Sequence, residues 1–204
     1  MNTKIEMIND FIEKEKQSER VNPKIHPEQL RKWAETQYVI NIEKGWHKPE
    51  YDVFHYLCLI MTEVSEVVDA DRKQRHASHE ICLLEGVEDD DTFFSMYEVH
   101  VKGTIDEELA DVCLRTIELG YKLYGSKMEW GRRYDDYALK HTVTKTALDL
   151  VRKYLGDGKP EDLAATVSML YGWADVMDVD LNLNVSLKLR FNGIMLRKGT
   201  YKKY

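Results

Sequence analysis

The amino-acid sequence predicts an all-α protein that folds as one helical bundle. Apolar residues recur at every third or fourth position over long segments, which is the spacing of an α-helix. Residues that break helices are scarce, with 4 prolines and 11 glycines among 204 residues. A chain of this length can bury a substantial core within one domain, so we expect residues 1–204 to form a single domain.

In the first third of the chain, the pattern predicts three helices. The first covers residues 3–17, and the second begins at Pro27, which suits the first position of a helix, and ends at Gly45. Pro49 helps to start the third, which covers residues 50–73. The residues that share a face in the first two helices are Ile5, Ile8, Phe11 and Ile12, and then Leu30, Trp33, Ala34, Gln37 and Asn41.

The helical pattern weakens between residues 74 and 104, where the acidic run 88–91 suits a solvated loop or a helix N-terminus. The rest of the chain predicts five further helices. A turn over residues 156–160, rich in glycine and ending in proline, separates two of them. Their expected ranges are 92–101, 105–124, 135–155, 161–178 and 182–196.

Composition argues against several classes of protein. The formal net charge of −7 argues against a general nucleic-acid binder, because neutralising phosphates requires a basic surface. No apolar run approaches the ~20 residues of a membrane span, and the N-terminus is too charged for a signal peptide. Cys58, Cys82 and Cys113 are widely separated in apolar surroundings, which predicts buried thiols in a reducing compartment. We therefore expect a cytoplasmic protein.

Two of the predicted helices carry an acidic pair at the border of their apolar face. Glu63 and Glu66 are three residues apart in one helix, and Glu108 and Asp111 repeat that spacing in another. At ~100° per residue, each pair lies on the same side of its apolar arc. If the two arcs pack together in antiparallel fashion, the pairs face each other across the seam.

Four carboxylates that converge on one seam need protons or cations to neutralise them. Two unit charges ~4 Å apart repel by about 4 kcal/mol at an effective dielectric of 20. Oxygen ligands favour a hard ion, Mg²⁺ first and Mn²⁺ second. A merely solvated role stays open, because such pairs are common on helices. A di-iron bundle needs Glu-x-x-His on paired helices, and the nearest match, Asp52-x-x-His55, occurs once.

The order of the acidic residues and the segments around them resemble the MazG-like all-α NTP pyrophosphatase superfamily. The matching segments, in order, are TEVSEVVDADRK, HVKGTIDEELADVCLRTIELG and DVDLNLNVSLKLRFN. The resemblance implies a helical bundle in which Glu63, Glu66, Glu108 and Asp111 coordinate Mg²⁺ that holds a nucleoside triphosphate. It also implies that water attacks to release a nucleoside monophosphate and pyrophosphate. The family forms dimers or dimers of dimers, which implies a homodimer or homotetramer.

Other residues are candidates for binding the substrate. Lys188 and Asn192 match the family's Lys-x-x-x-Asn, although a lysine lying along the surface and a surface asparagine would give the same pattern. Trp46 could stack on a nucleobase and Asn41 could hydrogen-bond its edge, whereas core packing is the alternative for the tryptophan. Glu63 is our candidate for the residue that orients or deprotonates the attacking water.

The chain departs from the family pattern at several positions. Thr62 replaces the first glutamate of the usual EExxE, and Met195 replaces an arginine of the last helix. Residues 125–179 are expected to be a helical insertion before that helix, which could reshape the oligomer or cover the site. Glu107 is an alternative ligand to Glu108, but the helical wheel places Glu108 nearer the apolar arc. The candidates for the missing positive charge are Arg197, Lys198 and Lys202.

The sequence therefore leads to the hypothesis of a Mg²⁺-dependent nucleoside triphosphate pyrophosphohydrolase that acts in nucleotide-pool housekeeping. One alternative is hydrolysis of another nucleotide-like phosphoanhydride on the same scaffold. A second alternative is a catalytically impaired MazG-like module that binds nucleotides or a partner.

Overall fold

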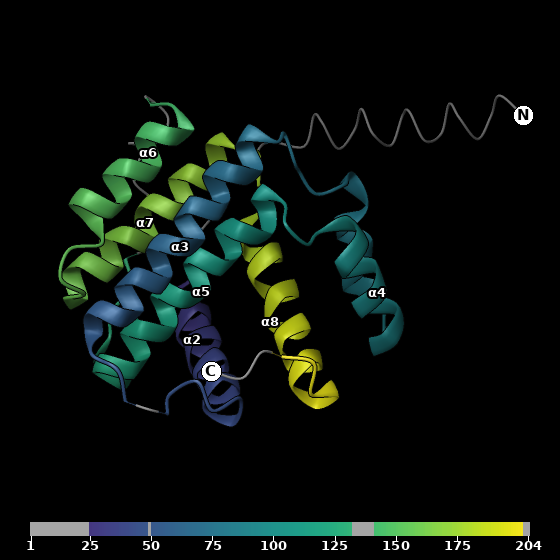
Figure 1. Ribbon diagram of the computed structural model, residues 1–204, viewed down its shortest axis with the longest axis horizontal. Coiled ribbons are helices and arrows are strands. Elements are labelled where there is room, and N and C mark those ends of the chain that lie inside the picture. Colours follow the sequence, from purple (N-terminus) through teal and green to yellow (C-terminus); the bar gives the residue numbers. More distant parts are fainter. Residues whose placement is uncertain (1–24, 49, 132–140, 202–204) are drawn as a thin grey trace, which may run out of the picture.

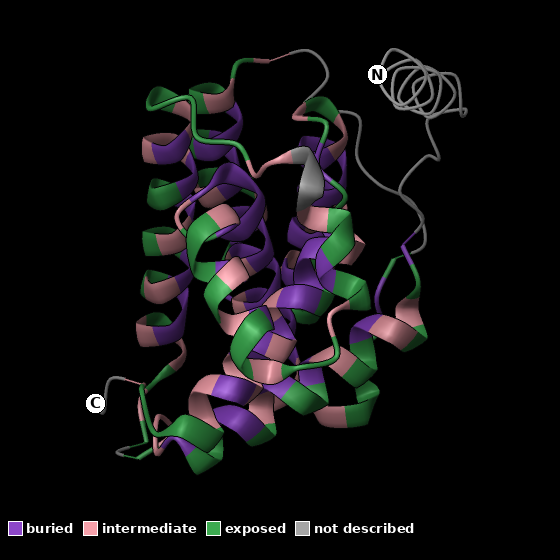
Figure 2. Ribbon diagram, turned by 90° about the vertical axis from the view of Figure 1, so that its right-hand side faces the viewer, coloured by how far each residue is buried: buried purple, intermediate pink, exposed green. Residues whose placement is uncertain are grey.

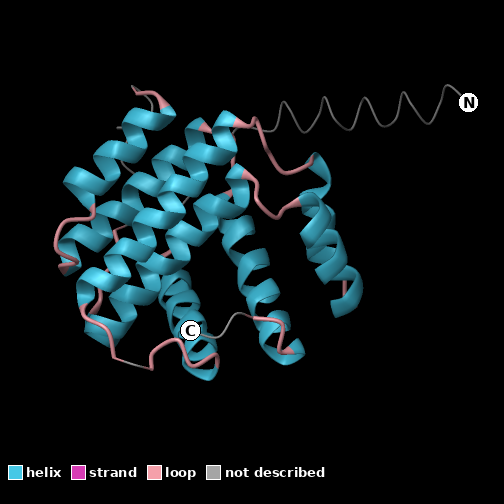
Figure 3. Cartoon of the chain, in the orientation of Figure 1, coloured by secondary structure: helices cyan, strands magenta, loops and turns pink. Residues whose placement is uncertain are grey.

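The computed structural model describes residues 25–48, 50–131 and 141–201, and every regular element within these ranges is a helix (Figure 3). The predicted all-α fold class is therefore confirmed. None of the described helices is both long and apolar enough to cross a membrane. The elements in chain order are α2 (Pro27–Glu43), α3 (Val53–Arg72), the 3₁₀ helix η1 (His79–Gly86), α4 (Asp90–His100), α5 (Ile105–Tyr124), the 3₁₀ helix η2 (Gly125–Lys127), α6 (Val143–Asp149), the π-helix η4 (Leu150–Tyr154), α7 (Pro160–Val176) and α8 (Leu181–Lys198).

Most of the expected ranges agree with the structure apart from small shifts at the helix ends. The helix expected over residues 3–17 lies outside the described residues. The 3₁₀ helix η1 has no counterpart among the expected helices. The helix expected over residues 135–155 differs most, because its described part begins at Val143 and continues as a π-helix from Leu150.

Capping side chains explain where several helices begin. Asp52 accepts a hydrogen bond from the N–H of His55 at 3.0 Å, so α3 begins at Val53 and not at residue 50. Such caps satisfy N–H groups that have no partner within the helix itself. The residues that cap four other helices in this way are Asp89, Thr104, Thr142 and Asp180.

Helix α5 lies at the centre of the bundle and packs against α2, α3, α7 and α8 (Figure 1). Most of its residues are buried, including the polar Thr116 and Glu118. Helices α3 and α5 run antiparallel, and a hydrogen bond of 2.8 Å from the N–H of Ile105 to the carbonyl of Arg75 joins their neighbouring ends. This is the arrangement on which the predicted seam depends.

Two hydrophobic clusters hold the helices together. The larger one joins α2, α3, α5, α6, α7 and α8, and Figure 2 shows the buried sides of the helices turned inward. The smaller one lies between η1, α4 and α8, where Phe191 stacks on Tyr97 and Phe94 at ring-centroid distances of 4.4 and 4.9 Å. Helix α8 therefore connects the α4 region to the main bundle.

Helices α6 and α7 belong to the segment expected to be an insertion. Helix α7 packs against α5, and α6 packs against α3. Both contribute buried residues to the larger cluster, among them Ala147, Leu163 and Trp173. The described part of this segment is thus integrated into the core of the bundle.

The prediction of three buried cysteines is wrong for two of them. Cys113 lies on α5 within the larger cluster. Cys58 and Cys82, in contrast, are exposed. Apolar neighbours in the sequence do not decide burial, because Cys58 lies on the outward side of α3 and Cys82 in the short helix η1.

The close approach of α5 to Trp130 can be tested at Gly120. A Cβ added there would lie 2.7 Å from the Trp130 ring. We expect Gly120→Ala to lower the free energy of unfolding by about 1 kcal/mol, because overpacking of about 1–3 kcal/mol outweighs a gain of about 1 kcal/mol in helix propensity. Gly193→Ala is the matched control, since its nearest heavy atom, on Arg197, is 3.6 Å away. The control should be stabilised in urea denaturation, and equal stabilisation of both variants would contradict the packing.

Candidate active site

The two acidic pairs lie where α3 and α5 run side by side. One carboxylate oxygen from each of Glu63, Glu66 and Glu108 can be chosen so that all three lie within 4.8 Å of one another. The two glutamates of α3 and the one of α5 are brought together by the antiparallel packing of the apolar arcs. Glu108 is buried, Glu63 is half-buried and Glu66 is exposed, so this carboxylate group opens to solvent on one side.

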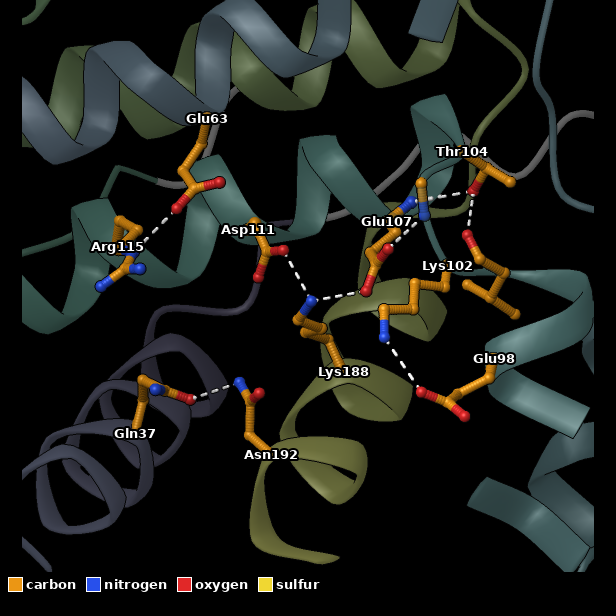
Figure 4. Close-up of polar contacts among 12 residues, drawn as sticks. Gln37, Glu63, Glu98, Lys102, Thr104, Glu107, Asp111, Arg115, Lys188 and Asn192 are labelled. Carbon is orange, nitrogen blue, oxygen red and sulfur yellow. Dashed lines mark hydrogen bonds and ion pairs between the residues drawn. The ribbon is translucent and has the colours of Figure 1, made fainter. Parts of the chain in front are cut away.

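Asp111 lies one turn beyond Glu108 and belongs to an ion-pair network with α8 (Figure 4). The Nζ of Lys188 is 2.6 Å from Oδ2 of Asp111 and 2.5 Å from Oε1 of Glu107. The other carboxylate oxygen of Glu107 accepts a hydrogen bond of 2.5 Å from the N–H of Gly103. Glu107 is therefore occupied by Lys188 and the backbone, and Glu108 is the residue of α5 that joins the glutamates of α3.

The burial of these carboxylates changes their ionisation. Burial, together with the nearby charges of Asp111, Glu107 and Glu66, raises the pKa of Glu108 to about 9. Burial also raises the pKa of Asp111, to about 6, while the positive charge of Lys188 acts in the opposite direction. Without a bound cation, Glu108 therefore holds its proton at neutral pH, and Asp111 is ionised and paired.

A cavity of about 220 Å³ opens beside the carboxylate group. Glu63 lines this cavity and also belongs to the group, so the two are continuous. The Nε of Arg115 lies 3.1 Å from Oε1 of Glu63, and the Nζ of Lys102 lies 2.9 Å from Oε1 of Glu98 (Figure 4). No described residue of the segment 125–179 lines the cavity. The basic residues that line it are Lys44, Lys102, Arg115 and Lys188.

Asn192 lines the cavity and begins a chain of amide groups that crosses from α8 to α2 (Figure 4). Its Nδ2 donates to Oε1 of Gln37 at 3.1 Å, and Nε2 of Gln37 donates to Oδ1 of Asn41 at 2.8 Å. Gln37 lines the cavity as well, whereas Asn41 does not. The carboxamide of Asn41, which is 2% exposed, therefore orients Gln37.

Trp46 lines the cavity with a half-buried ring that lies close to two positive charges. The Nζ of Lys44 is 4.6 Å from the centroid of the ring, and the guanidinium carbon of Arg115 is 5.4 Å from it. Trp46, a candidate from the sequence, therefore lines the cavity, and its ring makes cation–π contacts with Lys44 and Arg115.

Lys44, Lys102 and Arg115 are cavity residues that sequence reasoning missed, as is Gln37. Arg115 could have been found, because it lies one turn after Asp111 on the same helix. Lys44 could also have been found, because it directly follows α2 with helical backbone angles and continues the face of Gln37 and Asn41. Lys102 lies two residues after the end of α4, and no spacing rule points to it.

The residues predicted to replace the missing arginine do not line the cavity. The Nη2 of Arg197 is 2.5 Å from Oδ2 of Asp90, and the Nζ of Lys198 is 2.5 Å from Oδ1 of Asp91. Both basic residues therefore bind the start of α4. Lys202 lies outside the described residues.

The donor set of the carboxylate group fits a hard divalent cation. Glu63, Glu66 and Glu108 offer carboxylate oxygens alone, as Mg²⁺ and Mn²⁺ prefer. A di-iron centre would require histidine ligands. His55 instead stacks on the ring of Tyr51, at 3.9 Å between centroids.

Comparisons of the chain with protein-family models, with curated proteins and with solved structures found no match. The resemblance to the MazG-like superfamily therefore stays a prediction from the sequence. The geometry of the carboxylate group and its cavity is a separate source of support for a function.

The protonated state of Glu108 can be tested by replacing it with glutamine. Its pKa rises from an ordinary 4.5 to about 9 on folding, so the folded state binds more protons than the unfolded state between these values. With divalent cations removed by EDTA, the free energy of unfolding should therefore fall as the pH rises through this interval. The Glu108→Gln variant should show a smaller fall, because it lacks the titrating carboxyl group. Mg²⁺ is expected to raise the Tm of the wild type but not of the variant. Identical pH profiles of Tm in both proteins would contradict this assignment.

Proposed function

We propose that the protein is a Mg²⁺-dependent nucleoside triphosphate pyrophosphohydrolase, which converts a (deoxy)nucleoside triphosphate to a nucleoside monophosphate and pyrophosphate. The observation that carries this proposal is the convergence of Glu63, Glu66 and Glu108 beside a cavity lined by four basic residues. Groups that could hold a divalent cation are thereby adjacent to groups that could hold phosphates, as a metal–triphosphate substrate requires. The sequence resemblance supplies the substrate class.

Glu63, Glu66, Glu108 and Asp111 are the residues proposed to hold the cation. When bound, Mg²⁺ would neutralise the charge of the triphosphate and lower the pKa of a water molecule. Glu63 is the residue proposed to orient or deprotonate the attacking water, since it belongs to the carboxylate group and also lines the cavity. The oxygen of that water would join the α-phosphorus, and pyrophosphate would leave with the electron pair of the broken bond.

Lys188 and Arg115 are proposed to exchange partners when the substrate binds. Lys188 is paired with Asp111 and Glu107, and Arg115 is paired with Glu63. Each basic group thus neutralises a carboxylate that a cation would otherwise neutralise. A cation on the carboxylates would release both basic groups to donate charge-assisted hydrogen bonds to phosphate oxygens. Binding of cation and nucleotide is therefore expected to be cooperative.

The nucleoside is proposed to lie beside Gln37 and Asn192, whose amide groups line the same cavity. Nucleobase stacking on Trp46 stays a prediction from the sequence. Asn41, predicted to hydrogen-bond the base edge, does not line the cavity and is proposed to act through Gln37. Assembly into a homodimer or homotetramer, a cytoplasmic location and a part in nucleotide-pool housekeeping also belong to the proposal. The sequence resemblance and the composition support them.

The alternative is a catalytically impaired MazG-like module that binds a nucleotide or a partner. The observation that favours it is the pairing of Lys188 and Arg115 with acidic residues of the site, which reduces the negative charge available to a cation. Calorimetric binding of nucleotides, without pyrophosphate release in either Mg²⁺ or Mn²⁺, would support this alternative.

Glu66→Gln should lower pyrophosphate release from a panel of dNTPs by about 100-fold or more. The reason is that losing an outer partner of a metal ligand already costs about 10–100-fold, and Glu66 is proposed as a ligand itself. Asp69→Asn on the same helix is the matched control, because that exposed carboxylate binds only Arg72 and Lys73 in the described structure. Asp111→Asn is also expected to lose activity. Full activity of both Glu66→Gln and Asp111→Asn would rule out the proposed function.

The exchange of partners predicts opposite effects of one substitution. Lys188→Met should bind Mg²⁺ more tightly without nucleotide, because Asp111 and Glu107 lose the group that neutralises them. The KM for the nucleotide should nevertheless rise by about 10-fold or more, because a charged hydrogen bond worth about 1.5–3 kcal/mol is lost. Calorimetry and initial rates measure the two effects, and Lys198→Met on the same helix is the control. Weaker binding of Mg²⁺ by a folded Lys188→Met protein would contradict the exchange.

A further inference from the structure

Lys44 is a buried basic residue at the end of α2. Its backbone N–H donates to the carbonyl of Ile40 at 3.0 Å, which continues the helical pattern. The residue is 4% exposed, and its side chain lines the same cavity as Arg115 and Lys188. Three basic side chains therefore line one small cavity: Lys44 at the end of α2, Arg115 on α5 and Lys188 on α8.

The basic residues of the cavity differ in their partners. Lys102, Arg115 and Lys188 each form an ion pair with a carboxylate. Lys44 forms no ion pair and no side-chain hydrogen bond within the described part of the chain. A nearly buried charge is thus left without an opposite charge in contact, at a cavity that is open to a ligand.

The surroundings of Lys44 disfavour its charge. Burial lowers the pKa of Lys44 to about 8, with the positive charges of Lys188 and Arg115 acting in the same direction and Asp111 acting against them. A bound anion would reverse this effect, because a nearby opposite charge favours the charged form. The other charged residues that line the same cavity are Glu63, Lys102 and Glu107.

The ring of Trp46 keeps two cations beside the cavity. It lies 4.6 Å from the Nζ of Lys44 and 5.4 Å from the guanidinium carbon of Arg115. The ring of Tyr201 lies 5.9 Å from the same Nζ. A cation–π contact holds a cation in place without neutralising it. The charge of Lys44 is therefore positioned but still available to a ligand.

We propose that Lys44 binds a phosphate group of the polyphosphate chain, and that Trp46 positions Lys44 and Arg115 for this contact instead of stacking on the base. The identity of the ligand as a nucleoside triphosphate rests on the proposed function. The chemistry that Lys44 recognises is a polyphosphate anion, either free or attached to a nucleoside. Lys188 and Arg115 would each have to break an ion pair with a carboxylate to bind phosphate, whereas Lys44 has no such ion pair in the described structure.

Calorimetry of the full chain with inorganic tripolyphosphate and Mg²⁺ tests this role. We expect Lys44→Met to weaken binding by about 10–100-fold, the effect of losing one charged hydrogen bond. Lys44→Arg should keep the affinity within a few-fold, because it keeps the charge. Lys48→Met, at an exposed residue of the same turn, is the matched control and should bind as the wild type does. Unchanged affinity of Lys44→Met would overturn the proposal.

The pH dependence of binding in the wild type and in Lys44→Arg tests the same role without Lys44→Met. As the pH rises above about 8, the wild type should lose affinity for tripolyphosphate because Lys44 loses its proton. Lys44→Arg should lose less affinity, because a guanidinium stays charged over this range. Ionisation of the probe affects both proteins alike. Parallel pH profiles in the two proteins would overturn the proposal.

The role of Trp46 is tested by Trp46→Leu. If the ring positions Lys44 and Arg115, this variant should bind tripolyphosphate and an uncleavable α,β-imido dNTP with similar losses of affinity. A loss confined to the imido nucleotide would assign the ring to the base and overturn that part of the proposal.

Failure of the proposed function can be told apart from failure of this inference. Tripolyphosphate binding that depends on Lys44, without pyrophosphate release from any dNTP, would reject the proposed function and support the role of Lys44. Pyrophosphate release with an unchanged kcat/KM in Lys44→Met, together with unchanged binding, would reject the role of Lys44 alone.

Discussion

The packing of α3 against α5 is the interaction on which the candidate site depends. Fully buried apolar side chains, such as Ile60, Val67 and Val112, lie in the core that these helices share. Each contributes about 1.5–3 kcal/mol on burial, and together they outweigh even the repulsion of about 4 kcal/mol that two ionised carboxylates ~4 Å apart would exert. The raised pKa of Glu108 lowers that repulsion further, because its carboxyl group is protonated at neutral pH. Hydrophobic burial therefore sets the geometry, and Glu63 and Glu108 are held close together as a consequence.

Helix α8 adds the charge that makes this geometry tolerable. Burial disfavours the charge of Lys188, but Asp111 and Glu107 outweigh that effect and raise the pKa of Lys188. Phe191 of the same helix packs against α4, which holds α8 in place beside α5. A basic residue fixed between two carboxylates by packing on both sides can change partners without a large movement of the backbone, which is what the proposed binding of phosphate requires.

The helices and the carboxylate group could be predicted from the sequence, because helical periodicity alone fixes which residues border an apolar arc. The antiparallel pair of helices brings together Glu63, Glu66 and Glu108, whereas Asp111, which was predicted to join them, is paired with Lys188. The basic side of the site could not be predicted in the same manner. Lys44 continues one face of α2, but helical spacing does not show which side chains of α5 and α8 meet it at the cavity.

The four acidic residues have the same spacing in the sequence but differ in charge once folded. Without a cation, Glu108 is protonated, Asp111 shares Lys188 with Glu107, and Glu63 binds Arg115. Glu66 faces solvent, which screens its charge. Each carboxylate is therefore neutralised, paired or hydrated before any metal binds, and the fold has no need of a cation to hold the seam together. Under the proposed function, a site balanced in this manner would bind and release the cation with each substrate, whereas a structural metal would have to stay in place.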